Sequence, residues 1–452
     1  MNKKSLLSMA LAFTLVQSTF ISSPAFASEA ESKITQSKSN LSSGMKLKSG
    51  KPEKAGMISE KLKDIDNYVN DAINAGITPG AVVLVAKNGI VVKKTAYGYA
   101  QKYDMGNLLE KPIPMTTDTM FDMASCTKVM ATTQAIMQLV SKGKIKVNDK
   151  VSKYIPEFSQ NGKKDVTIED LLTHTSGLTP WAPTFYHAKN ADEVLKFICN
   201  LSLEYETGTA RKYSDFSFMT LAFVVKAVTG QAIDEYTHEN IYSKLKMNHT
   251  MFNPLKDSKS SKFKIAATSW GNPFEYRMVA EPGWIYPISE NVADWDGWRN
   301  YTLVGEVNDG NSFYANGGVA GHAGLFSTVD DLAILGQTML NGGKYGNVKL
   351  YDKAVLDEFT TVQEAVPNWT SYNYGYGFEI ARYSYMGSLE SDAAFGHSGF
   401  TGTQVVFDPK NNLEIIILTN KQNNGVNSNT SYASTFALSR NICDAVYSSI
   451  VK

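Results

Sequence analysis

Cysteine is scarce in this chain, with Cys126, Cys199 and Cys443 the only three among 452 residues. Their odd number and wide separation match neither a disulfide framework nor the paired spacing of a zinc site. One bridge between two of them remains open. The six histidines include no H-E-x-x-H motif. We therefore expect no metal ion and no cofactor.

Neither sign of charge is in excess. The sequence has 44 basic and 44 acidic residues, and without Lys3 and Lys4 the basic count falls to 42. Nucleic-acid binding requires a concentrated basic surface, and a membrane-binding face is usually rich in lysine and arginine. We expect neither kind of partner. Charge gives no indication of the oligomeric state.

Long apolar runs are also missing, apart from Leu6 to Val16. This run is too short to span a membrane. Two lysines precede it and Ala25-Phe26-Ala27 follows it, which is the pattern of a secretory signal peptide. We expect residues 1–27 to be removed and the protein to be secreted or associated with the cell wall. Residues 28–53 are rich in Ser, Lys and Glu and predict a flexible tether.

Strand patterns occur near both ends of the chain. Gly80 to Lys87 and Ile90 to Tyr97 flank the hairpin dipeptide Asn88-Gly89. Gly402 to Phe407 and Leu413 to Thr419 are rich in β-branched residues. Helical periodicity is expected over 59–74, 127–141, 168–174, 192–200, 216–229, 329–341 and 434–448.

This order predicts an α/β (α+β) fold in which both chain ends build one antiparallel sheet flanked by helices. The helical middle predicts an inserted lobe. We expect a single domain over residues 54–450. Its sheet lobe would comprise about 54–122 and 318–450, and its helical lobe about 123–317.

The main catalytic candidate lies in Met123-Ala124-Ser125-Cys126-Thr127-Lys128. A serine three residues before a lysine on one helical turn puts both side chains on the same face. The lysine can accept the hydroxyl proton if its surroundings lower its pKa. The same spacing occurs elsewhere, as at Ser243/Lys246, but only Ser125 follows an extended segment and opens an apolar helix. By spacing alone, a serine N-cap explains the position equally well.

Two other segments carry candidate chemistry. Tyr213-Ser214-Asp215 precedes a helix, and a tyrosine beside a Ser–Lys pair can act as a phenolate base. Packing is the alternative, because the chain has 23 tyrosines. Gly396 to Thr403 opens a strand with small residues, where a substrate backbone could approach and a main-chain N–H could bind an oxyanion. An ordinary glycine-rich strand entry is the alternative there.

Taken in this order, the three segments resemble the serine penicillin-recognising family, in the branch of class C β-lactamases, low-molecular-weight penicillin-binding proteins and related esterases. Val166 to Leu178 and Gly317 to Ser327 look like the same branch. The second of these, preceded by Val307-Asn308-Asp309, is most similar to penicillin-binding proteins of the 4B type. The resemblance covers roughly residues 56 to 450 and implies a β-lactamase/transpeptidase-like fold.

The resemblance also implies residue roles. Ser125 would be the acylated nucleophile, and Lys128 and Tyr213 would share the acid and base work. The main-chain N–H groups of Ser125 and Phe400 would form the oxyanion hole. His174 and His322 are interpreted as structural. The substrate-binding residues would be Asp215, His397, Ser398, Gly399 and Phe400.

Two positions depart from the family's pattern. Asp215 stands where the family usually has asparagine, which removes an amide donor to the substrate. His397 stands where lysine is usual, which removes a fixed positive charge. We expect His397 to orient Tyr213 or the substrate and to titrate near neutral pH. Both departures argue against strong β-lactamase activity and leave the substrate class open.

The resemblance implies a secreted serine acyl hydrolase that forms an acyl-enzyme on D-alanyl groups of the cell wall, like a D-Ala-D-Ala carboxypeptidase. An esterase acting on D-alanyl teichoic acid or small esters is the alternative. A catalytically silent penicillin-binding-like receptor belongs to another class, which the intact Ser125, Lys128 and Tyr213 disfavour. The expected ligands are peptidoglycan or teichoic acid, with β-lactams as further candidates.

The segment from Trp270 to Tyr314 is unusually aromatic and holds four of the six tryptophans. Few periodic apolar runs cross it, so it predicts a long irregular loop. Such a loop could cover the cleft and stack its rings on sugar or peptide. Equally, the rings could simply pack against the helical lobe, because aromatic side chains dominate ordinary cores.

Overall fold

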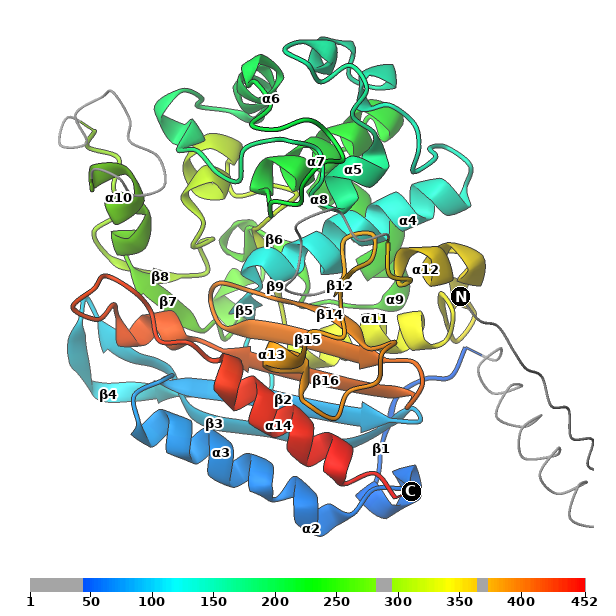
Figure 1. Cartoon of the computed structure of the whole chain (residues 1–452). Helices are drawn as coiled ribbons and strands as arrows, with labels where there is room; N and C mark the ends of the chain where they lie inside the picture. Colours follow the sequence, from blue (N-terminus) through cyan, green and yellow to red (C-terminus); the bar gives the residue numbers. More distant parts are fainter. Residues whose placement is uncertain (1–43, 282–294, 364–372, 452) are drawn as a thin grey trace, which may run out of the picture.

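The structure is a computed structural model that describes residues 44–281, 295–363 and 373–451. A nine-stranded sheet lies at its centre, with the strand order β1-β3-β2-β16-β15-β14-β13-β12 and with β4 paired to β3 (Figure 1). Every pairing is antiparallel except that of β1 with β3. The strands are β1 Lys48–Ser49, β2 Gly80–Lys87, β3 Ile90–Asp104, β4 Asn107–Pro114, β12 Asn373–Tyr374, β13 Glu379–Ile380, β14 Phe395–Ser398, β15 Thr403–Asp408 and β16 Leu413–Thr419.

The two ends of the chain meet at the centre of this sheet. Strand β16 pairs with β2 in a register that runs from Leu413 opposite Lys87 to Thr419 opposite Ala81. Both strands are almost wholly buried, which explains their near-continuous apolar sequences. The predicted α/β (α+β) fold with a sheet built from both chain ends is confirmed.

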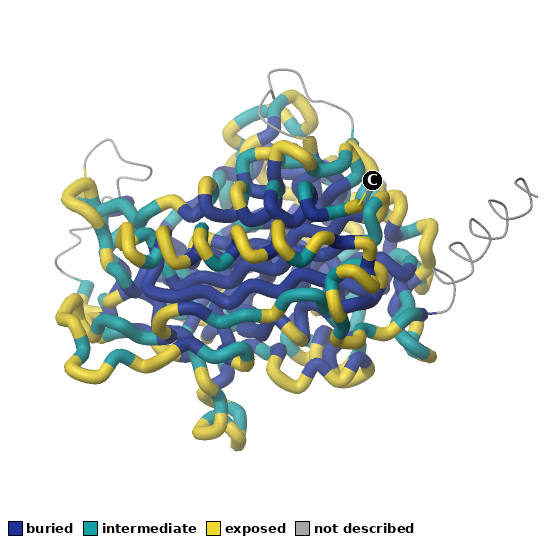
Figure 2. Tube along the Cα trace, turned by 90° about the horizontal axis from the view of Figure 1, so that it is seen from below, coloured by how far each residue is buried: buried dark blue, intermediate teal, exposed yellow. Residues whose placement is uncertain are grey.

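Helices cover both faces of the sheet. Helices α3 (Asp64–Asn74) and α14 (Phe436–Ser448) pack on one face, where Figure 2 shows their buried sides turned toward the strands. Val83 and Ile417 belong to this layer. Because side chains alternate along a strand, their neighbours Val82 and Leu418 point to the opposite face and join the larger core.

The larger core joins the sheet to the helical middle of the chain. Helix α11 (Val329–Leu340) packs directly on β16 and β2, and Figure 1 shows α4 to α8 beyond it. These and the remaining α-helices are α2 Ser59–Leu62, α4 Thr133–Ser141, α5 Ile168–Leu172, α6 Ala191–Asn200, α7 Asp215–Thr229, α8 Ile233–Thr237, α9 Ser243–Leu245, α10 Pro273–Ala280, α12 Lys353–Phe359 and α13 Tyr383–Met386. The division into a sheet lobe and a helical lobe stays a prediction.

Three short sheets complete the described part of the chain. One consists of β5, β9 and β6, one of β7 and β8, and one of β10 and β11. Their strands are β5 Phe121–Asp122, β6 Met251–Phe252, β7 Ala267–Trp270, β8 Thr302–Val304, β9 Leu325–Ser327, β10 Lys344–Tyr345 and β11 Val348–Lys349.

Several sequence expectations need correction. The hairpin strand predicted to end at Tyr97 continues as β3 to Asp104 and pairs with β4, whose exposed residues show little apolar alternation. The helix predicted over 127–141 begins as a π-helical turn at Lys128–Thr132. The segment predicted as one irregular loop contains α10 and β8.

The predicted signal peptide and residues 28–43 of the predicted tether lie outside the described residues. The last part of the tether belongs to the fold, because the Lys48 N–H donates to Gly89 and the Met45 carbonyl accepts from Asn341. Within the described ranges, no single helix is long and apolar enough to cross a membrane. One pair bent by 72°, Asp215–Thr229 with Ile233–Leu245, passes that test when its two helices are taken together.

Candidate active site

Ser125 and Lys128 lie within hydrogen-bond distance of each other. The Lys128 Nζ donates to the Ser125 Oγ at 3.0 Å. Lys128 is completely buried, whereas Ser125 lines a cavity. The spacing of three residues therefore brings the hydroxyl and the amine together, as the sequence predicts.

Three acceptors surround the buried ammonium of Lys128. Besides Ser125, its Nζ donates to the Asp215 Oδ1 at 2.7 Å and to the His322 carbonyl oxygen at 3.2 Å. A buried charge is tolerated only when it is paired and hydrogen-bonded. Asp215 thus forms an ion pair with the catalytic candidate, a role that the sequence did not reveal.

The backbone around Ser125 is held in a sharp turn. Ala124 has a φ of 45°, which is uncommon for a residue with a side chain. The Asp122 carboxylate holds this turn by accepting from the Ala124 N–H at 2.9 Å and from the Asn308 N–H at 2.6 Å. Burial raises the pKa of Asp122 to about 6. Ser125 is thereby placed in the turn that follows β5, with its side chain at the cavity.

Tyr213 lies beside the same lysine. The Lys128 Nζ is 4.7 Å from the centre of the Tyr213 ring, and Tyr213 lines the cavity that holds Ser125. His174 lies behind it, with ring centres 4.5 Å apart, and its Nδ1 accepts from the Ser214 N–H at 3.0 Å. These are the contacts of a residue that positions the Tyr213 segment.

The third predicted segment packs directly against the turn that holds Ser125. The Thr401 hydroxyl donates to the Asp122 carbonyl at 2.7 Å, and the Thr403 hydroxyl donates to the Met123 carbonyl at 3.0 Å. A Cβ on Gly399 would lie 2.6 Å from the Met123 carbonyl oxygen, so glycine permits this close approach.

Phe400 lines the cavity, while Ser398 ends β14 just before it. The Gly399 N–H is used in a bond to the Thr403 carbonyl. The assignment of the oxyanion hole to the N–H groups of Ser125 and Phe400 stays a prediction.

His397 differs from its sequence-based description. Its side chain is buried, and its Nδ1 donates to the Ser398 carbonyl at 2.7 Å. Burial, together with the nearby charge of Lys128, lowers the pKa of His397 to about 3. The expectation that His397 titrates near neutral pH is therefore wrong, because a protonated ring would be a second buried cation beside Lys128. Its ring centre is 6.0 Å from that of Tyr213, so contact with Tyr213 remains available.

The cavity beside Ser125 has a volume of about 260 Å³. Among the described residues that line it, none is a lysine or an arginine, and three are carboxylic acids. The lining residues are Ala124, Ser125, Pro180, Trp181, Tyr213, Asp215, Asn272, Phe274, Glu275, Met278, Asn308, Asp309, His322, Ala323, Phe400 and Tyr432.

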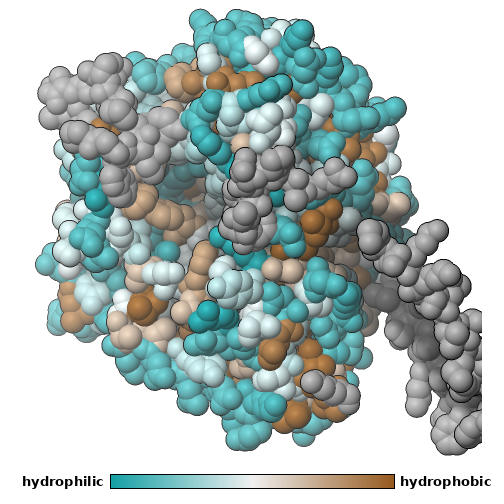
Figure 3. Space-filling model, viewed as in Figure 1, coloured by the Kyte–Doolittle hydropathy of each residue, from teal (hydrophilic) through white to brown (hydrophobic). Residues whose placement is uncertain are grey.

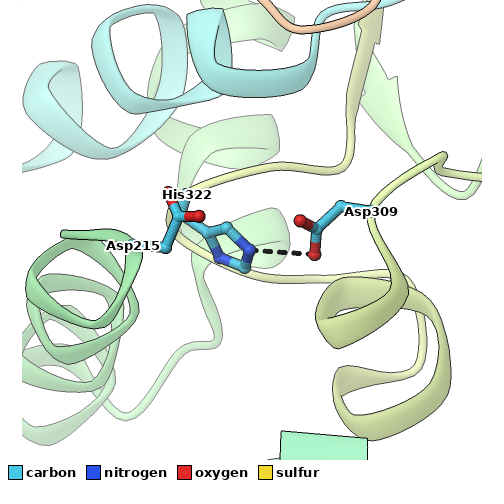
Figure 4. A group of neighbouring side chains, drawn as sticks. All are labelled: Asp215, Asp309 and His322. Carbon is cyan, nitrogen blue, oxygen red and sulfur yellow. Dashed lines mark hydrogen bonds and ion pairs between the residues drawn. The ribbon is translucent and has the colours of Figure 1, made fainter. Parts of the chain in front are cut away.

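One wall of the cavity is acidic (Figure 4). The His322 imidazole lies between Asp215 and Asp309, and its Nε2 is 2.9 Å from the Asp309 Oδ1. Although burial raises it, the charge of His322 and its hydrogen bond hold the pKa of Asp309 below the usual range. Burial and the charge of Asp309 raise the pKa of Glu275. His322, interpreted from sequence as structural, therefore also belongs to the cavity wall.

The same three side chains have the spacing of a metal-ligand set. One donor atom each from Asp215, Asp309 and His322 lie within 4.8 Å of one another. Existing contacts compete for these groups, because the Lys128 ammonium binds the Asp215 Oδ1 and the His322 Nε2 binds the Asp309 Oδ1. We therefore assign the three residues no metal-binding role.

Comparison with known proteins identifies the family. The chain matches the Beta-lactamase family over residues 65–436. It belongs to the β-lactamase family. This β-lactamase-family hydrolase is 38% identical over 387 residues to the N-acetylmuramyl-L-alanine amidase of Bacillus subtilis (strain 168), a match covering 83% of this chain and 84% of that one.

Other relatives point in the same direction. An Escherichia coli (strain K12) protein with the provisional name D-alanyl-D-alanine carboxypeptidase is 37% identical over 398 residues, covering 84% of this chain and 87% of its own. Among solved structures, a penicillin-binding protein homologue from Caulobacter crescentus has a TM-score of 0.64 at 21% identity, covering 87% of this chain and 99% of that chain. That likeness supports the fold alone.

The sequence missed part of the cavity wall of this hydrolase. Asn272 and Glu275 come from the start of α10, and Asp309 precedes a π-helical turn. The family resemblance around Val307-Asn308-Asp309 included Asp309 but implied no role for it. Nothing local marks Glu275, because only the fold brings it to Ser125.

In the aromatic segment from Trp270 to Tyr314, some rings pack against other parts of the fold and one lines the cavity. Trp295 packs in a ring cluster with Phe185, Trp298 and Tyr314, at centre distances of 4.8 to 5.0 Å. Phe274 instead lines the cavity next to Phe400, with ring centres 5.0 Å apart. Trp284 and Tyr286 lie outside the described residues.

Proposed function

We propose that this chain is a secreted enzyme that hydrolyses an amide bond of peptidoglycan, the bond between N-acetylmuramic acid and L-alanine. The reaction proceeds through an acyl-enzyme on Ser125. Secretion is supported by the signal-peptide pattern of residues 1–27.

The observation that carries the choice of bond is the charge of the cavity. A D-Ala-D-Ala carboxypeptidase must accept a terminal carboxylate next to the scissile nitrogen. Here no lysine or arginine is among the described lining residues, Asp309 is held as a carboxylate, and Lys128 is already paired with Asp215. The low pKa of His397 leaves that ring neutral where the family usually has a lysine. The muramyl–L-alanine bond carries no charge beside its nitrogen, so it suits this site better.

The proposed acylation uses the contacts around Lys128. On substrate binding, Lys128 passes a proton to Asp215, its 2.7 Å neighbour, and becomes a neutral amine. Ser125 Oγ, 3.0 Å from Nζ, attacks the lactyl carbonyl carbon while its proton moves to Lys128. The C–N bond then breaks, and the leaving L-alanyl amine takes the proton from Lys128.

Deacylation reverses these roles. A water molecule takes the place of the departed amine and gives a proton to the neutral amine of Lys128. Its oxygen then forms the new C–O bond, the ester bond to Ser125 breaks, and Ser125 regains its proton. The products are free N-acetylmuramic acid and a peptide with a free L-alanine amino group.

The relatives support a cell-wall substrate and also supply a second candidate. The Bacillus subtilis relative is named for the muramyl–L-alanine bond, whereas the Escherichia coli relative is named for D-Ala-D-Ala. A D-Ala-D-Ala carboxypeptidase, expected from the sequence, is therefore the second candidate. It requires a carboxylate contact that the cavity does not offer among its described lining residues.

The test compares two substrates with the purified protein. One is N-acetylmuramyl-L-alanyl-D-isoglutamine, and the other is an N-acylated D-Ala-D-Ala dipeptide, with products identified by mass spectrometry. We expect cleavage of the first and little cleavage of the second. Exclusive release of D-alanine would replace the proposed function with the second candidate.

Variants separate the proposed site from other serines. Ser125→Ala should lower turnover by at least about 10³-fold, as loss of a nucleophile does, and should abolish labelling by a fluorophosphonate. Ser243→Ala is the matched control, because Ser243 has the same spacing to Lys246 on an exposed helix end. A fully active, folded Ser125→Ala protein would refute the mechanism.

A further inference from the structure

An aromatic groove lies next to the catalytic cavity. It has a volume of about 220 Å³ and is lined by Trp270, Gly271, Asn272, Pro273, Tyr276, Trp298, Arg299 and Asn300. We propose that this groove binds a sugar ring of the peptidoglycan substrate. The proposal rests on the proposed function and adds the part of the substrate that the catalytic cavity does not hold.

The rings that line the groove are unusually exposed. Trp270 is 50% exposed and Tyr276 is 44% exposed, although large apolar rings usually lie in the core. Trp298 lies edge-on to Tyr276, with ring centres 5.4 Å apart. An aromatic face is apolar and electron-rich, so it attracts the C–H face of a sugar ring while the sugar hydroxyls stay in water.

The groove is built on ordered backbone. Trp270 ends β7, and the next residue, Gly271, donates its N–H to the Tyr301 carbonyl at 2.9 Å. A Cβ on Gly106 would lie 3.7 Å from the Trp270 ring, so the turn between β3 and β4 packs against one part of that ring. A rigid platform loses little conformational freedom when a ligand binds.

Two polar side chains connect the groove to the catalytic cavity. Asn272 lines both, and its Nδ2 donates to the Glu275 Oε2 at 2.7 Å. The buried Arg299 donates from Nε to the Asn272 Oδ1 at 3.0 Å and from its two terminal nitrogens to the carbonyls of Val307 and Asn308. The groove therefore continues the wall that leads to Ser125.

The size of the catalytic cavity argues for such an outer subsite. Its 260 Å³ is less than the roughly 300–1,000 Å³ of sites that enclose whole small ligands. It can hold the groups around the scissile bond, but not a complete muropeptide. The face of the molecule shown in Figure 3 is mainly hydrophilic, with its apolar residues in separate patches. Trp270 and Tyr276 are two large side chains that lie exposed beside the cavity.

The experiment measures kinetics with and without the sugar. The substrates are N-acetylmuramyl-L-alanyl-D-isoglutamine and D-lactoyl-L-alanyl-D-isoglutamine, which share the scissile amide. Trp270→Ala and Tyr276→Ala should each raise the KM for the muramyl substrate about fivefold to tenfold, without changing kcat or the Tm. Neither should alter cleavage of the lactoyl substrate.

Tyr383→Ala is the matched control, because Tyr383 is an exposed ring on α13, outside both sites. A KM rise of equal size on both substrates would assign the rings to the peptide and overturn the sugar proposal. Unchanged KM values on both would overturn it as well.

A binding measurement keeps this test independent of the proposed reaction. Muramyl dipeptide should bind the Ser125→Ala protein several-fold more tightly than the Ser125→Ala/Trp270→Ala protein in calorimetry. If the wild-type protein cleaves only D-Ala-D-Ala, the proposed function fails while this comparison still decides the groove. Equal affinities of the two proteins would refute the groove.

Discussion

Lowering the pH should expose the unusual state of His397. Its pKa is about 3 in the folded protein and about 6.5 in an unfolded chain. Above pH 6.5 the ring is neutral in both states and has no effect on the pH dependence. Between pH 6.5 and about 3, His397 is protonated in the unfolded chain but stays neutral in the folded protein. The free energy of unfolding therefore decreases as the pH falls.

The size of this loss follows from the two pKa values. At pH 5 the unfolded form gains about 2 kcal/mol from protonation of this one ring relative to pH 7. The physical reason is that Nδ1 already donates to Ser398, and Nε2 has no hydrogen-bond partner among the described residues. A proton on Nε2 would therefore be buried without an acceptor and close to Lys128.

The assay is urea unfolding of wild-type protein and of His397→Gln at pH 7 and pH 5. The variant should lose about 2 kcal/mol less free energy of unfolding than the wild type between these pH values. Any loss of stability that the substitution causes equally at both pH values cancels, because only the change between pH 7 and pH 5 is compared. His238→Gln is the control, because His238 is exposed. Equal pH dependence of wild type and His397→Gln would show that His397 is not held neutral by burial.

Three further substitutions test other parts of the site. Asp215→Asn removes the carboxylate that lies 2.7 Å from the Lys128 Nζ. It should lower turnover of the muramyl substrate at least about tenfold and raise the labelling rate with a fluorescent penicillin. No change in either rate would contradict the proposed proton transfer from Lys128 to Asp215. His397→Lys should improve cleavage of an acylated D-Ala-D-Ala relative to its C-terminal amide, and an equal change on both would remove the charge argument. Trp295→Ala should cost about 1–2 kcal/mol of unfolding free energy, because its ring is only partly buried. The kcat of the folded protein should stay unchanged, and intact stability would show that this ring cluster does not support the fold.

The sequence by itself determined the features that depend on neighbouring residues. The strands at Gly80–Lys87 and Leu413–Thr419 match their predicted bounds, because each is a continuous apolar run closed by turn residues. The pairing of Ser125 with Lys128 was also predictable, since three residues on one helical turn bring two side chains together. The family resemblance added Tyr213 and the segment after Gly396.

Only the tertiary structure decided the state and surroundings of these groups. Asp215 is an ion-pair partner because α7 brings it to Lys128, and His397 is neutral because β14 buries it. Glu275 and Asp309 reach the cavity from distant segments, and the sequence-based prediction assigned neither residue a role there. Burial and pairing between distant segments set the charge of a group, and the order of residues along the chain does not contain that information locally.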